Sequence, residues 1–163
     1  MHSFAEWLSA TEMSALVNEY SWIWPACETL HFVGLALLIG NIGLVDLRLL
    51  GVEKRLALAP LSRFIRFAVL GFSINLLTGI VFFVGNPLQY INNIAFGFKI
   101  AFIALACVNV AIFYVTGVNR KVALMGPGDD APPLAKFIAA MSLFLWIAVM
   151  YMGRMLPYIG NSF

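Results

Sequence analysis

The chain has 163 residues, of which 62% are hydrophobic and 11% are charged, and its formal net charge is +2. So few charged side chains cannot cover a water-facing surface, which excludes a soluble globular domain. The charge excess is small and forms no basic patch interleaved with aromatic residues, which argues against binding of nucleic acid. We therefore expect an integral membrane protein in contact with membrane lipid.

The predicted elements begin with residues 4–18, which interleave apolar and acidic side chains. This segment is too polar to cross a bilayer and predicts an amphipathic helix in the membrane interface. Four apolar stretches follow, and each is long enough to cross a hydrocarbon core of roughly 30 Å as a helix. The predicted spans are residues 22–49, 65–85, 94–118 and 135–158. We expect one all-α domain over residues 1–163, a four-helix transmembrane bundle.

Basic residues gather in two of the joints between the predicted spans. They follow the first span or precede the fourth, and they are Arg48, Lys54, Arg55, Arg63, Arg66, Arg120, Lys121 and Lys136. Loops rich in Lys and Arg stay in the cytoplasm, and the N-terminal segment is acidic. We expect a multi-pass protein of the bacterial inner membrane with both termini in the periplasm.

Four ionisable residues fall inside the predicted spans and near the same membrane surface. At a rise of about 1.5 Å per residue, Glu28 and His31 lie about two to three turns below the outer surface in the first span. Lys99 lies about one to two turns below it in the third span, and Arg154 about one turn below it in the fourth. Ionisable residues inside spans are rare and mark functional sites. We expect these four to form a site in the outer leaflet.

A haem group would account for all four residues. The imidazole of His31 could ligate the iron, while Lys99 and Arg154 could hold the two propionates. Gly34, one turn below His31, would let a flat macrocycle or a neighbouring helix approach the backbone. Glu28 could orient the second ring nitrogen of His31, or form a salt bridge to either cation.

The same residues also suit three arrangements without haem. Glu28, Lys99 and Arg154 could form an ion-pair network that pins the helices, which would suit a non-catalytic structural or partner-binding subunit. Cys27 and His31 are spaced as an i, i+4 pair that could hold a soft metal. Glu28 and His31 could also relay a proton.

A second polar set lies deeper in the bundle. Asn41, Asn75 and Asn109 fall between the midplane and the cytoplasmic half of spans one, two and three, where hydrogen bonds between helices are expected. Asp46 and Arg48, at the inner end of the first span, are expected to form an ion pair near the cytoplasmic headgroups.

The stretch "ETLHFVGLALLIGNIGLVDLRLLG", followed two spans later by "FGFKIAFIALACVNVAIF", resembles a superfamily of small bacterial haem-associated membrane bundles. Its named members include the CopD-type copper-resistance domain and the HemJ-type protoporphyrinogen oxidase. The resemblance covers the first and third spans well, the second weakly, and the fourth only through Arg154. The matching residues are His31, Gly34, Gly43, Arg48, Lys99 and Asn109.

The resemblance implies a haem b held by the first-span histidine, with electron transfer or oxidation of a hydrophobic substrate at the outer side of the membrane. Such a protein would be a haem-dependent oxidoreductase or an electron carrier, with a quinone or another redox protein as partner. The substrate is not readable from the residues, because the cofactor carries the chemistry. The apolar, glycine-lined faces also suggest a homo-oligomer.

This chain departs from a two-histidine haem site, since its only histidines are His2 and His31. A second axial ligand would have to be Met150 or another methionine of the fourth span, Lys99, water, a residue of another subunit, or none. Trp146 lies roughly two turns below Arg154. It could stack on a porphyrin or quinone, or pack in the core.

Overall fold

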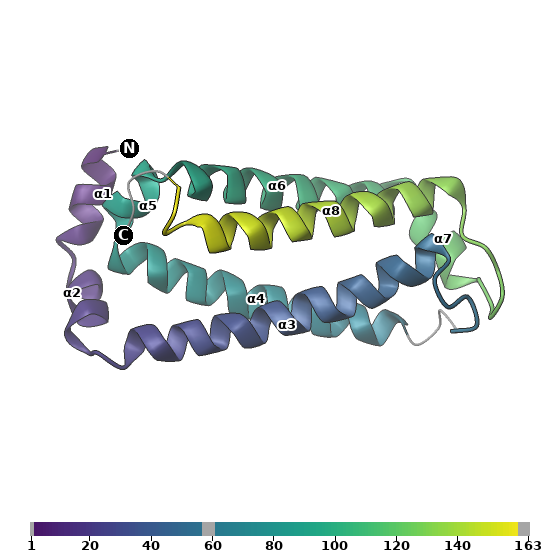
Figure 1. The fold of residues 1–163 in the computed structure, drawn as a ribbon, viewed down its shortest axis with the longest axis horizontal. Helices are drawn as coiled ribbons and strands as arrows, with labels where there is room; N and C mark the ends of the chain where they lie inside the picture. Colours follow the sequence, from purple (N-terminus) through teal and green to yellow (C-terminus); the bar gives the residue numbers. More distant parts are fainter. Residues whose placement is uncertain (1, 57–60, 160–163) are drawn as a thin grey trace.

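A computed structural model of the chain describes residues 2–56 and 61–159, and all regular structure in these ranges is helical. Four long helices are apolar enough to cross a membrane. They are α3 (Ile23–Leu50), α4 (Leu61–Gly85), α6 (Ile94–Val115) and α8 (Pro133–Met155), and they run side by side as an elongated bundle (Figure 1). The predicted four-helix transmembrane bundle is confirmed, and the chain is a multi-pass membrane protein.

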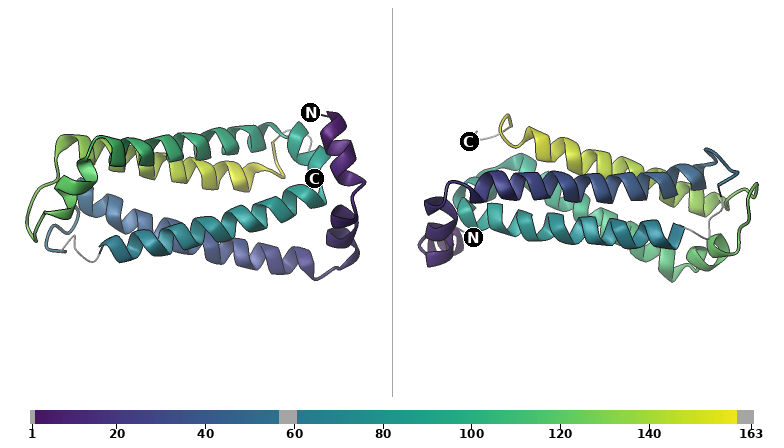
Figure 2. Two further views of the ribbon diagram at one scale, coloured as in Figure 1. Left: turned by 180° about the vertical axis from the view of Figure 1, so that it is seen from behind. Right: turned by 90° about the horizontal axis from the view of Figure 1, so that it is seen from below.

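The N-terminal segment forms two helices, α1 (His2–Ser9) and α2 (Glu12–Glu19), instead of the single helix predicted over 4–18. Thr11 breaks the segment because its backbone is extended and its Oγ1 accepts a hydrogen bond from the Ser14 N–H at 3.3 Å, which caps α2. Both helices lie across one end of the bundle (Figures 1 and 2). This placement suits the expected position at the membrane interface.

Two short helices are absent from the predicted elements, α5 (Pro87–Asn92) and α7 (Val118–Ala123). Proline at the first position starts α5, where its missing N–H costs nothing. The predicted third span, 94–118, is three residues too long. Gly117 adopts a left-handed conformation with φ +69°, which glycine tolerates and which ends the run of helix before α7.

The closest helix contact joins α3 and α4 at two glycines. A Cβ on Gly71 would lie 2.6 Å from the Gly34 carbonyl oxygen, and one on Gly34 would lie 2.9 Å from the Gly71 oxygen. Only glycine allows backbones to approach so closely. Along the rest of the bundle α6 packs on α8 and α3 on α8. In the described residues the backbones of α4 and α6 stay apart, and the two helices meet through the stacked rings of Phe83 and Phe96 at the end that carries α1 and α2.

Two asparagines hold the end of the bundle that carries α1 and α2. Asn18 Nδ2 donates to the Gly85 oxygen at 2.9 Å and so fixes α2 on the last turn of α4. Asn93 is 2% exposed; its Oδ1 accepts from the Ala95 N–H at 2.9 Å, and its Nδ2 donates to the Leu156 oxygen at 2.8 Å. Asn93 therefore fixes the start of α6 against the end of α8.

Arg48 organises the opposite end of the bundle. Its guanidinium, 2% exposed, donates to the carbonyl oxygens of Leu56, Gly126 and Asp129. The predicted ion pair between Arg48 and Asp46 is wrong, because residues two apart point to different sides of a helix. Arg48 reaches the loops instead, while Asp46 faces α8.

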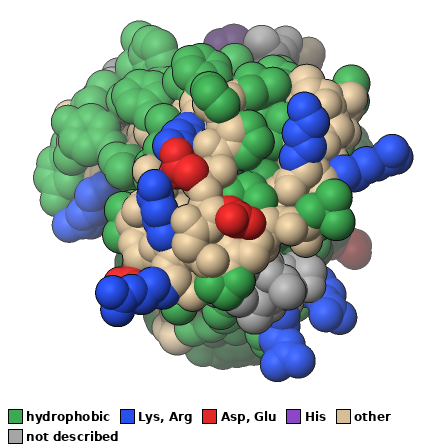
Figure 3. All heavy atoms as spheres, turned by 90° about the vertical axis from the view of Figure 1, so that its right-hand side faces the viewer, with side chains coloured by type: hydrophobic (Ala, Val, Ile, Leu, Met, Phe, Trp, Pro, Cys, Tyr) green, Lys and Arg blue, Asp and Glu red, His purple; other side chains and the backbone are tan. Residues whose placement is uncertain are grey.

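An exposed ion-pair cluster joins the two loops at the same end. Asp130 contacts Lys54 Nζ at 2.8 Å and Lys136 Nζ at 2.7 Å. Hydrogen bonds from Lys136 and then from Lys54 lower the pKa of the Asp130 carboxyl to about 2. Figure 3 shows that Lys and Arg side chains gather on this end. Both chain ends lie at the other end (Figure 2).

Candidate functional site

His31 projects from α3 toward α4 and is half-buried. Its Nδ1 lies 2.7 Å from Oγ1 of Thr78, which is 5% exposed. The same Oγ1 lies 2.8 Å from the carbonyl oxygen of Ile74, one turn earlier in α4. A buried threonine on the neighbouring helix therefore holds the imidazole in place.

The hydrogen bonds around Thr78 assign the tautomer of His31. A hydroxyl has one proton to donate, and a threonine inside a helix usually donates it to the carbonyl oxygen four residues earlier, which here is the Ile74 oxygen at 2.8 Å. The Thr78 oxygen then accepts from the Nδ1–H of His31, and this assignment rests on the network as a whole. The Nε2 atom of a neutral ring is left with a lone pair. It has no hydrogen-bond partner within the described residues.

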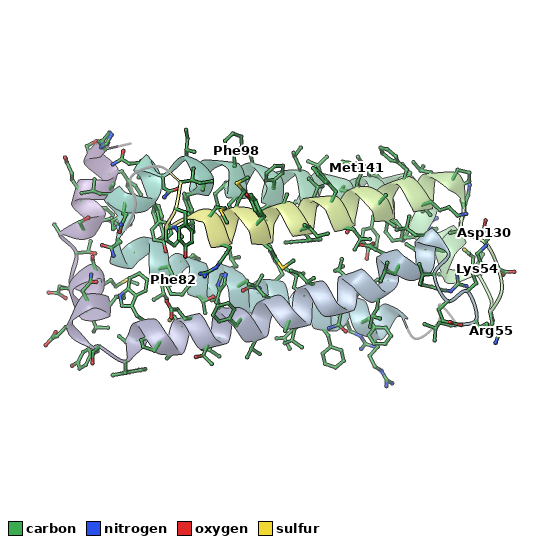
Figure 4. The ribbon with its side chains drawn as sticks, viewed as in Figure 1. Lys54, Arg55, Phe82, Phe98, Asp130 and Met141 are labelled. Atoms are coloured by element: carbon green, nitrogen blue, oxygen red, sulfur yellow. The ribbon has the colours of Figure 1, made fainter. Side chains whose placement is uncertain are left out.

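Aromatic rings cover His31 on the side toward α1 and α2. The ring centroid of Phe82 lies 5.6 Å from that of His31, and Trp24 stacks on Phe82 at 5.2 Å. Figure 4 shows Phe82 near that end of α4. These contacts restrict the imidazole further, since Thr78 holds one ring nitrogen and Phe82 limits rotation of the ring.

Lys99 lies at the same level of the bundle as His31. It is close enough to His31 to interact with it electrostatically. Its Nζ also lies 3.7 Å from where a Cβ on Gly153 would be, so Gly153 leaves room for the lysine against α8. No salt bridge neutralises Lys99 within the described residues. The structure thus brings an imidazole and an unpaired ammonium together from α3 and α6.

We call the level of the bundle that His31 and Lys99 share the His31 layer. Glu28 and Arg154 lie at its edge, and both are exposed. Arg154 lies over the Tyr158 ring, 5.8 Å from its centroid. Glu28 is near Tyr90; burial of the phenol, and then the Glu28 charge, raise the pKa of Tyr90 to about 12. Thr78, and not Glu28, holds Nδ1 of His31.

Within residues 2–56 and 61–159, no salt bridge joins Glu28 to Lys99 or Arg154. The expected ion-pair network is therefore not present among these three residues. A soft-metal site also lacks ligands, because no three His, Cys, Asp or Glu side chains cluster around Cys27 and His31 in the described part of the chain.

The other candidate residues lie elsewhere in the bundle. Gly34 contacts the backbone of α4, so a neighbouring helix and not a macrocycle occupies its open side. Trp146 is 8% exposed and packs with Leu38 and Val149 in a core cluster. Met150 is 37% exposed on α8.

The deeper asparagines behave differently from one another. Asn109 donates to the Ile138 oxygen of α8 at 3.0 Å, which confirms the predicted bond between helices. Asn41 instead donates to the Leu37 oxygen of its own helix at 2.6 Å. The amide nitrogen and oxygen of the Asn75 side chain are buried, have no hydrogen-bond partner in the part of the chain that the structure describes, and lie against Gly34.

Sequence reasoning missed three residues that shape the site: Thr78, Phe82 and Gly153. A threonine inside an apolar span is a weak signal, because its hydroxyl usually bonds to its own helix four residues earlier. The Thr78 hydroxyl also bonds to its own helix, at Ile74, and its contact with His31 exists only because α3 lies against α4. Gly153 could have been found from its position beside Arg154, although nothing in the sequence pairs it with Lys99.

Compared with known proteins, the chain matches no family model, no curated protein and no solved structure. The resemblance to CopD-type and HemJ-type proteins therefore stays a prediction.

Proposed function

We propose that this protein binds a haem b in the outer half of the membrane, with Nε2 of His31 as an axial ligand. One observation carries the proposal: Nδ1 of His31 lies 2.7 Å from Oγ1 of Thr78, whose hydroxyl is also 2.8 Å from the Ile74 oxygen. With the hydroxyl proton on the Ile74 side, Nδ1 carries the ring proton, and Nε2 is unprotonated and has no partner in the described part of the chain. Metal-ligating histidines commonly donate their other ring N–H to an oxygen in this way, which fixes the ring and raises its basicity.

The residues around His31 suit a haem in three respects. Lys99 is a cation with no salt bridge in the described part of the chain and can hold a propionate. Phe82 and Trp24 supply flat apolar surface beside the imidazole. Gly71 fills the space at Gly34, so the haem would be held by the residues around His31 and not at Gly34. Arg154, exposed nearby, is the second candidate for a propionate.

When bound, haem supplies one-electron redox chemistry, and the protein holds it and tunes its potential. We propose a role in electron transfer or in oxidation of a hydrophobic substrate. The basic end formed by the α3–α4 and α7–α8 loops would face the cytoplasm of a bacterial inner membrane. The His31 layer and both termini would then lie toward the periplasm.

The test is the visible spectrum of the protein purified after haem-replete expression. We expect a Soret band in the wild type and its loss in His31→Ala. Thr78→Val removes the acceptor but keeps the shape of the side chain, and should weaken haem retention by about 10- to 100-fold. The matched control is Thr29→Val, whose hydroxyl bonds only to Pro25 of its own helix.

Two results would reject the proposal. The first is wild-type protein without a Soret band after haem-replete expression, which would favour a non-catalytic partner-binding subunit. The second is unchanged haem ligation in His31→Ala. Equal haem retention in the Thr78 and Thr29 variants would leave His31 as a ligand but remove Thr78 from its support.

A further inference from the structure

A cavity of about 350 Å³ lies in the other half of the bundle, away from the His31 layer. All four long helices line it, and its rim lies between α4 and α6, whose backbones stay apart in the described residues. The rim residues Val69, Val110 and Tyr114 are exposed. The cavity is therefore open sideways, toward the lipid.

The wall of the cavity is apolar and aromatic. Phe72 reaches it from α4, Phe113 from α6 and Trp146 from α8. Sites for small organic ligands have volumes of roughly 300–1,000 Å³ and similar walls, with a few polar groups that fix orientation. The volume admits one ring system with a short substituent.

Three polar side chains line the same cavity, and each is more than nine-tenths buried: Asp46 at 6% exposure, Asn109 at 8% and Ser142 at 8%. One N–H of the Asn109 amide is already used, because its Nδ2 donates to the Ile138 oxygen. The Ser142 hydroxyl lies close to the Asp46 carboxyl.

Asp46 is the group in this set whose hydrogen-bonding capacity is not met. Its Oδ2 is buried and has no hydrogen-bond partner among residues 2–56 and 61–159. Arg48, the nearest basic residue in the sequence, directs its guanidinium to loop carbonyls. A buried oxygen without a donor is unfavourable. The terminal torsion of an aspartate is soft, so the carboxyl can turn Oδ2 into the cavity.

We propose that this cavity binds a neutral, membrane-soluble phenol whose ring lies among the aromatic side chains and whose hydroxyl donates to Oδ2 of Asp46. A lipid acyl chain would cover the apolar wall but leave Oδ2 without a donor. A charged ligand would lose its hydration against a wall that offers it few polar groups. Entry between α4 and α6 requires a ligand that dissolves in the bilayer.

This site is separate from the one proposed for haem. Asp46 follows His31 by 15 positions in α3, which places it about 22 Å further along the helix axis. Binding of a phenol at Asp46 does not require haem at His31. The Soret band reports on the first site alone, so failure of one proposal can be told from failure of the other.

The experiment measures equilibrium binding of a tritiated decyl hydroquinone to the full chain in lipid nanodiscs, with empty nanodiscs as background. The matched ligand is its dimethyl ether, which has a similar apolar body but no hydroxyl donor. We expect saturable binding of the hydroquinone and at least about tenfold weaker binding of the ether. The difference corresponds to the loss of one hydrogen bond to a charged or strongly polar acceptor.

Two variants and one control complete the experiment. Asp46→Leu has a side chain of similar shape, removes both acceptor oxygens and should weaken hydroquinone binding by about tenfold without a similar loss for the ether. Ala106→Leu, at a buried lining position on α6, should fill the cavity and abolish binding of both. Ser73→Ala removes an exposed α4 hydroxyl that bonds only to Val69 and should change nothing.

Equal affinity of wild-type protein for the hydroquinone and its ether would overturn the proposal, and this comparison needs no variant to fold. Binding that is lost in Ala106→Leu but unchanged in Asp46→Leu would also overturn it, since the cavity would then accept any apolar molecule. Non-saturable binding equal to that of empty nanodiscs would show that the ligand only partitions into lipid, and would refute the site.

Discussion

Replacing Gly71 with alanine should separate α3 from α4. The new Cβ would lie 2.6 Å from the Gly34 oxygen and 2.6 Å from the Leu38 nitrogen, and both are backbone atoms that no side-chain rotation can move. Ordinary van der Waals contact begins at 3.4 Å, so the two helices must part by about 0.8 Å at this point. Overpacking of this kind costs typically about 1–3 kcal/mol of unfolding free energy.

The same displacement should reach His31, one turn from Gly34 on α3. The bond from His31 Nδ1 to Thr78 is 2.7 Å long, and lengthening by about 0.8 Å would bring it to the limit of a hydrogen bond. Gly71→Ala should therefore loosen the orientation of the imidazole as well as lower stability. Both effects follow from one local contact.

The assay is reversible unfolding in mixed micelles, followed by circular dichroism as the denaturing detergent is increased. Gly79→Ala is the matched control, because it lies in the same helix and a Cβ there meets no atom within 4 Å. It should be neutral, or stabilise α4 by about 0.5–1 kcal/mol through reduced chain entropy. Equal unfolding free energies for the two variants would refute the close packing of α3 on α4.

Asn93→Ala should lower the free energy of unfolding by about 1–2 kcal/mol, because it removes the cap of α6 and the bond to the Leu156 oxygen. Asn92→Ala, at the exposed neighbour, is the control, and a similar loss there would show that the cap contributes nothing. Asp130 should stabilise the protein above about pH 4, its ordinary pKa being 3.8, and this contribution should disappear as the pH falls toward the folded-state pKa of about 2. The unfolding midpoints of wild type and Asp130→Asn should differ at pH 6 and converge at pH 2, and a constant difference across this range would contradict the assignment.

The transmembrane architecture could be predicted because the bilayer imposes a simple rule on the sequence. A span needs about 20 apolar residues in a helix, and the predicted bounds lie within four residues of the observed helices. The errors fall where short-range backbone chemistry decides. Thr11 divides the N-terminal segment, and Gly117 ends α6 early.

The candidate site could be predicted in its depth but not in its partners. Helical rise places His31 and Lys99 near one level, and the structure has them interacting. The direction in which each side chain points around the helix axis could not be predicted in the same way. Adjacent residues differ by about 100° in this direction, so a small error in the rotation of a helix gives a side chain a different neighbour. From the sequence, Glu28 at i−3 is therefore a reasonable candidate for the hydrogen-bond partner of His31. In the structure, Thr78 of the neighbouring helix is the partner of Nδ1 instead.

The sequence by itself determined that the chain has four helices able to cross a membrane, their positions to within four residues, and which ionisable residues lie in those helices. Burial of apolar surface and satisfaction of backbone hydrogen bonds act locally along each segment, so a linear pattern records them. The tertiary structure alone decided that Gly34 meets Gly71, that Nδ1 of His31 meets Oγ1 of Thr78, and that Asp46 lines a cavity without a partner for Oδ2 in the described residues. These features depend on the rotation and separation of packed helices, which arise from contacts between residues far apart in the chain.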